Sequence, residues 1–225
     1  MSKKLMTGLL ALVALAAMAL PAMASANPVL TEGTTTVASG TKILGTNVGE
    51  TVMKTSLGNV TCDSATLTGT LTTNETAKGI DGDIESAHFF NKEGLQAEKE
   101  PDKECSSWTG GVSVTPSPAT NGLPWCVTAT EANDNLKLRG NSCTAETRPI
   151  RFILVFTNGL IGTCTYQRSL PVEGTLTTGT GEASISEQEF TKFEGGGGCP
   201  ASGKLNMKFT LETDVSPFTG LTFSS

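Results

Sequence analysis

Apolar and polar residues alternate along several stretches of the chain, which is typical of strands with one buried and one solvated face. In SATLTGTLT, residues 64–72, leucine and small residues occupy one side and hydroxyl-bearing residues the other. KLNMKFTLET, residues 204–213, alternates in the same way. IRFILVF, residues 150–156, is apolar on both sides except at Arg151, which predicts a central strand buried on both faces.

Turn-forming residues separate these stretches. Asn, Asp and Gly recur between them and favour the tight connections of antiparallel strands. Many short strands with frequent turns predict an all-β fold, either an antiparallel β-sandwich or a partly closed barrel. The segment 92–122, first charged and then rich in Pro and Ser, is predicted to be a long surface loop. Shorter strands are predicted at residues 42–45, 84–90, 123–130, 162–166, 172–178, 183–186 and 221–224.

The N-terminus has a pattern of its own. Lys3 and Lys4 precede an apolar run at residues 9–20, and the small residues ASA follow at 24–26. This is the pattern of a secretory signal peptide, residues 1–26, cleaved after Ala26. The apolar run is shorter than the roughly 20 residues of a membrane-spanning helix, so we expect no membrane span after cleavage. The sequence therefore predicts a protein secreted from a bacterial cell.

The remaining residues, 27–225, have the size of one large all-β domain or two small ones, and a single domain is predicted because no linker divides them. The chain has 22 acidic and 16 basic residues, two of the latter in the signal peptide, so the exported part carries a net charge of about −8. A negative protein does not suit nucleic acid or an anionic membrane surface as a partner. A cell-envelope polysaccharide or another surface protein is the expected partner instead.

Six cysteines lie in the exported part, and an even number in an exported chain indicates disulfide bonds. No metal site is predicted, because no two cysteines form a C-x-x-C pair and the chain has a single histidine. The six are Cys62, Cys105, Cys126, Cys143, Cys164 and Cys199.

The pentapeptide GTLTT occurs twice, at residues 69–73 and 174–178, and each copy follows one cysteine and precedes another. This order predicts two related halves, each closed by its own disulfide, Cys62–Cys105 and Cys164–Cys199. Cys126 then pairs with Cys143 by elimination. Six cysteines permit other pairings, and an accident of composition in a threonine-rich chain is the alternative to a true repeat.

Three segments also carry a resemblance: GNVTC at 58–62, TCTY at 163–166 and CPASGKLNMKFTLE at 199–212. They resemble secreted Thr- and Cys-rich β-sheet proteins of unknown function that are common in some actinobacteria. The resemblance implies an exported β-rich domain and no defined activity.

No catalytic residues or cofactors are predicted. His88 would need a nucleophile or an orienting acid, and the sequence marks neither, so a partly buried strand histidine is the favoured interpretation. The segments 81–85 and 131–135 are rich in side-chain oxygens, but turns stabilised by Asp and Asn explain both without calcium.

The most regular surface feature is a row of threonines, Thr66, Thr68, Thr70 and Thr72. Threonines two apart on a strand repeat at about 6.6–6.8 Å and can match a polysaccharide lattice if the row continues on adjacent strands. The sequence shows such a row on at most two strands, and threonine is also a common residue on any wet strand face.

Two tryptophans complete the candidates. Trp125 shares an apolar side with Leu123 and Val127, which predicts a core position. Trp108 lies in the predicted long loop and is the aromatic side chain expected to be exposed.

These features favour a secreted or cell-surface, non-enzymatic protein, structural or adhesive, that binds through loops or the threonine row. The alternative is a carbohydrate-binding module that uses exposed aromatic residues such as Trp108. A secreted hydrolase, which would need His88 in an open cleft, is the third hypothesis.

Overall fold

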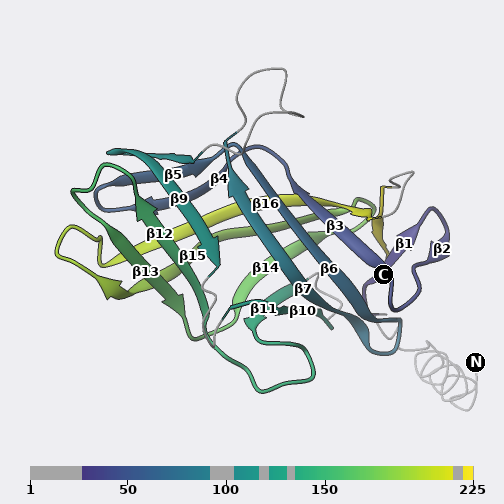
Figure 1. The fold of residues 1–225 in the computed structure, drawn as a ribbon. Coiled ribbons are helices and arrows are strands. Elements are labelled where there is room, and N and C mark those ends of the chain that lie inside the picture. The colour runs from purple at the N-terminus through teal and green to yellow at the C-terminus, as the bar shows by residue number, and fades with distance from the viewer. Residues whose placement is uncertain (1–26, 92–103, 117–121, 131–134, 215–219, 225) are drawn as a thin grey trace, which may run out of the picture.

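The computed structural model describes residues 27–91, 104–116, 122–130, 135–214 and 220–224, and all regular structure within them is β-strand. The predicted signal peptide lies outside the described residues. Every pairing between the strands is antiparallel (Figure 1). The strands are β1 (Val29–Glu32), β2 (Thr35–Thr36), β3 (Lys42–Asn47), β4 (Thr51–Thr55), β5 (Gly58–Cys62), β6 (Ser64–Glu75), β7 (Gly79–Phe90), β8 (Cys105–Ser107), β9 (Gly110–Pro116), β10 (Trp125–Ala129), β11 (Asn135–Gly140), β12 (Ile150–Phe156), β13 (Thr163–Arg168), β14 (Val172–Thr177), β15 (Glu182–Gly195), β16 (Ser202–Thr213) and β17 (Thr222–Ser224).

The pairings of the large sheet close into two rings of strands that lie end to end (Figure 1). The first ring runs β3-β6-β7-β10-β11-β14-β15-β16 and back to β3. The second ring runs β4-β5-β8-β9-β12-β13-β15-β16 and back to β4. The large sheet is therefore not a clean barrel: β15 and β16 belong to both rings, and β7 of the first ring also pairs with β9 of the second through Phe89 and Val114.

Each half of the chain supplies four neighbouring strands of the first ring. The first half, residues 42–129, contributes β3, β6, β7 and β10. The second half, residues 135–213, contributes β11, β14, β15 and β16. Within each half the pairings follow the same order, so the ring consists of two equivalent sets of four strands.

The two GTLTT copies lie at equivalent places in these sets, on β6 and β14. Gly69 pairs with Ile43 on one side and Ile84 on the other. Gly174 correspondingly pairs with Leu136 and Ile185. In both copies the glycine pairs with an aliphatic residue on one neighbouring strand and with an isoleucine on the other. This shared register supports a true internal repeat.

Three disulfides have the pairing that the sequence predicts. Cys62–Cys105 lies within the first half of the chain and Cys164–Cys199 within the second. Cys126–Cys143 joins β10 to the segment after β11, and so links the two halves. All six cysteines are paired, as expected for a protein of an oxidising compartment.

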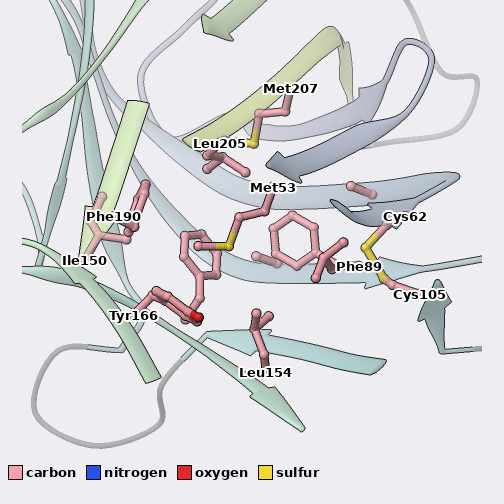
Figure 2. Packing of buried hydrophobic residues seen from close by; sticks show 14 of the residues in the cluster. Met53, Cys62, Phe89, Cys105, Ile150, Leu154, Tyr166, Phe190, Leu205 and Met207 are labelled. Atoms are coloured by element: carbon pink, nitrogen blue, oxygen red, sulfur yellow. A yellow bond between two sulfur atoms is a disulfide. The ribbon is translucent and has the colours of Figure 1, made fainter. Parts of the chain in front are cut away.

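Large side chains fill the second ring and the middle of the molecule (Figure 2). The centre of the aromatic ring of Phe152 lies 5.7 Å from that of Phe89 and 5.3 Å from those of both Trp125 and Phe190. Tyr166 is fully buried, and its hydroxyl donates a hydrogen bond to the Pro200 carbonyl at 3.0 Å. Burial raises the pKa of Tyr166 to about 12, so this donor stays protonated at physiological pH.

A small sheet, β17-β1-β2, covers the far end of the first ring (Figure 1). Leu30 and Phe223 from this sheet are buried in the apolar cluster at that end. The buried amide of Asn74 fixes β1, because it accepts a hydrogen bond from the Leu30 N–H and donates to the carbonyls of Leu30 and Val37, at 2.7–2.9 Å.

Two expectations from the sequence are wrong. The segment 92–122 is not one long loop, because β8 and β9 form a hairpin within it, and Val112 of β9 is fully buried. Strand β12 is buried on one face only, with Val155 on the other face 41% exposed. A strand of a closed ring has one inner and one outer face, and the outer face of β12 meets solvent.

Candidate functional site

A row of polar side chains crosses the outer face of the first ring. Thr66 on β6 pairs with Thr46 on β3, and Thr46 pairs with Thr210 on β16. Thr68 and Thr70 continue the pattern along β6. We call Thr46, Thr66, Thr68, Thr70 and Thr210 the threonine face. In a regular sheet, residues at such positions repeat at about 4.7–4.9 Å across the strands and about 6.8 Å along one strand.

The hydroxyls of this face differ in their partners. Thr68 shares a hydrogen bond of 2.5 Å with Ser86. Within the part of the chain that the structure describes, no side-chain partner is found for the hydroxyls of Thr46 and Thr66. Both residues are partly exposed. These two hydroxyls are therefore open to a ligand.

An ion pair marks one edge of the threonine face. Lys42 donates to Glu85 at 2.6 Å and to the Thr70 hydroxyl at 2.7 Å, and that hydroxyl donates to Glu85 at 2.6 Å. The hydrogen bond from Lys42, aided by that from Thr70, holds the pKa of Glu85 below its ordinary value. Glu85 is therefore a carboxylate at neutral pH.

The predicted threonine row is only partly regular. Thr66, Thr68 and Thr70 follow one another on the outer face, but a bulge on β6 between Leu71 and Thr73 removes Thr72 from the pairing with β7. Thr72 is exposed and has no paired neighbour on that strand. The sequence also missed Thr46 and Thr210. Thr46 lies beside Thr66 only because β3 pairs with β6, and Thr210 lies beside Thr46 only because β16 pairs with β3.

His88 lies on the exposed side of β7, opposite Thr66, and is not the partly buried residue that the sequence predicts. A bulge explains the error. Ile84 and Ser86 would share a face in a regular strand, but the register shifts between them at Glu85. Ile84 therefore packs against the core while Ser86 and His88 point outward. His88 is not among the residues that line the apolar cavity inside the first ring.

The tryptophans are both packed. Trp125 is fully buried, as predicted. Trp108 is only partly buried, but its ring lies 5.2 Å from that of Phe156 and covers Gly58, where a Cβ would approach the Trp108 Cβ to 2.7 Å. Trp108 therefore packs against the core and does not stand free in solvent as the sequence predicts.

The acidic segment 81–85 belongs to the middle of β7 and is not a turn. The Asp83 carboxylate accepts hydrogen bonds from the Ser142 hydroxyl and the Cys143 N–H, both at 2.8 Å. Asp83 lies close to the sulfurs of Cys126 and Cys143, but the disulfide between them removes the thiolates that a metal would need. Asp83 thus positions the segment that carries Cys143. The other oxygen-rich segment falls mostly outside the described residues.

The geometry defines a disulfide-stabilised, antiparallel all-β protein. Comparisons with protein families, with curated proteins and with solved structures find no match. The resemblance to secreted actinobacterial proteins stays a prediction. Among the described residues, no helix is long and apolar enough to cross a membrane.

Proposed function

We propose that the protein is an exported, non-enzymatic binding protein that attaches to a hydroxyl-rich polysaccharide through its threonine face. The observation that carries this proposal is the alignment of Thr210, Thr46 and Thr66 across three adjacent strands. A lattice-binding surface needs this continuation, and one strand alone could not supply it.

Further features support this function over the alternatives. The paired hydroxyls lie on rigid strands of a closed, disulfide-linked sheet, so little conformational entropy is lost on binding. A module that stacks sugars on exposed aromatic rings is less well supported, because Trp108 packs on Phe156. A hydrolase that depends on His88 is less well supported, because this residue lies on an open sheet face.

Replacing the central hydroxyls by methyl groups tests the proposal. We expect the triple variant Thr46→Val/Thr66→Val/Thr210→Val to keep its fold, since valine has the same shape and favours strands. Each lost hydrogen bond costs about 1 kcal/mol, so the affinity for the polysaccharide should fall at least about tenfold. The measurement is co-sedimentation with insoluble peptidoglycan, chitin and cellulose.

The matched control is Thr175→Val/Thr177→Val on β14. This strand carries the second GTLTT copy and lies four positions from β6 around the first ring. The control variant should bind as the unaltered protein does. Equal loss of binding in both variants, or no sedimentation of the unaltered protein with any of the three polymers, would contradict the proposal.

A further inference from the structure

The first ring encloses an apolar cavity of about 120 Å³. The cavity of the second ring is about 30 Å³, although both rings have eight strands. The difference follows from the residues that point inward. Phe89, Phe152 and Phe190 fill the second ring, whereas small residues occupy several inward positions of the first.

Glycine and alanine create this space. Gly45, Gly69 and Gly82 lie on the three neighbouring strands β3, β6 and β7, and Ala183 lies on β15. The remaining wall consists mainly of aliphatic side chains from all eight strands of the ring. No charged side chain other than Asp83 contributes to the lining, and the Asp83 carboxylate is bound to the Ser142–Cys143 segment on the outer face.

One end of the cavity is closed by Leu30 and Phe223 from the small sheet. The hydrogen bonds of Asn74 hold β1 in this position. A molecule inside the ring would therefore be separated from water at this end.

We propose that the interior of the first ring is a binding site for a compact apolar ligand, of the size of an aromatic ring or a short branched hydrocarbon. An eight-stranded closed sheet has an interior that is either filled by side chains or able to hold one small ligand. Cavities of about 150 Å³ lined by Leu, Ile and Phe bind benzene and xenon. The first ring has similar size and chemistry. The threonine face lies on the outer side of the same strands, and two of its residues, Thr68 and Thr70, also border the cavity.

Benzene is the probe for the test. It is added in increasing amounts to the disulfide-bonded protein, and the methyl signals of the protein are followed by NMR. We expect saturable shifts of the methyl signals of Ile84, Ile185 and Leu67, which line the cavity. The methyl signals of Leu160, which is 86% exposed, should not move. Absence of shifts at the three cavity residues, or equal shifts at Leu160, would overturn the proposal.

Two single substitutions are designed to reduce the volume of the cavity. A Cβ at Gly45 would lie 3.4–3.7 Å from Leu211, Leu67 and Phe209, which is ordinary contact, so Gly45→Ala should fold. Ala183→Val adds two methyl groups from β15, which is separated from β3 by β16 in the ring. Each should weaken benzene binding at least about tenfold, as one methylene group does in other apolar pockets. The surface variant Leu160→Ala should bind unchanged. Unaltered affinity in both filled variants would place benzene elsewhere and overturn the proposal.

Discussion

The double variant Cys62→Ala/Cys105→Ala is expected to lose about 4 kcal/mol of the free energy of unfolding. The two cysteines are 43 residues apart, and a cross-link over a loop of this length restricts the unfolded chain strongly. Both are nearly fully buried, so the replacement also leaves unfilled volume in the core. Because small proteins are stable by only about 5–15 kcal/mol, this is a large share of the total.

Urea denaturation at neutral pH measures this loss. Cys126→Ala/Cys143→Ala is the matched comparison, because its cysteines are only 17 residues apart and the expected loss is about 3 kcal/mol. If the Cys62→Ala/Cys105→Ala variant unfolded at the same urea concentration as the unaltered protein, this result would contradict the Cys62–Cys105 bond.

The second large effect is expected at the glycines of the two GTLTT copies. A Cβ at Gly69 would lie 2.5 Å from the Asp83 carbonyl oxygen, and one at Gly174 would lie 2.5 Å from that of Ser184. The neighbouring atoms belong to the backbone, so a strand must move to admit a methyl group. Gly69→Ala and Gly174→Ala should therefore each destabilise the protein by about 3 kcal/mol, at the upper end of the usual cost of overpacking.

Gly45→Ala is the control for both glycines, because its new methyl group meets only side chains at ordinary distances. We expect its unfolding midpoint to be unchanged or slightly raised, measured by thermal and urea denaturation. If only one of the two GTLTT variants were destabilised, the two positions would not be structurally equivalent, and the interpretation of GTLTT as a repeat would fail.

Local alternation was enough to predict many of the strands. The segment 64–72 falls within β6 and 204–213 within β16, because each has a clear apolar side. Alternation fails where a bulge interrupts it. On β15 the inward residues Ile185 and Phe190 are an odd number of positions apart, because the register shifts between Ile185 and Gln188. The sequence therefore predicted only the first part of this strand.

The candidate sites depend on long-range pairing, which no local pattern encodes. Thr46 and Thr210 are 164 residues apart and become neighbours only through the pairing of β3 with β16. The cavity likewise requires the ring to close before Gly45 and Ala183 face the same interior. The disulfide pairing could be predicted because one cysteine precedes and another follows each GTLTT copy, which leaves Cys126 and Cys143 to pair with each other.

Disulfide mapping tests the central claim most directly, namely that two related halves, each closed by its own bond, form the first ring. The protein is digested without reduction and the linked peptides are identified by mass spectrometry. The account predicts peptides that join Cys62 to Cys105, Cys164 to Cys199 and Cys126 to Cys143. A peptide that joins Cys62 to Cys164 or Cys199 would contradict it.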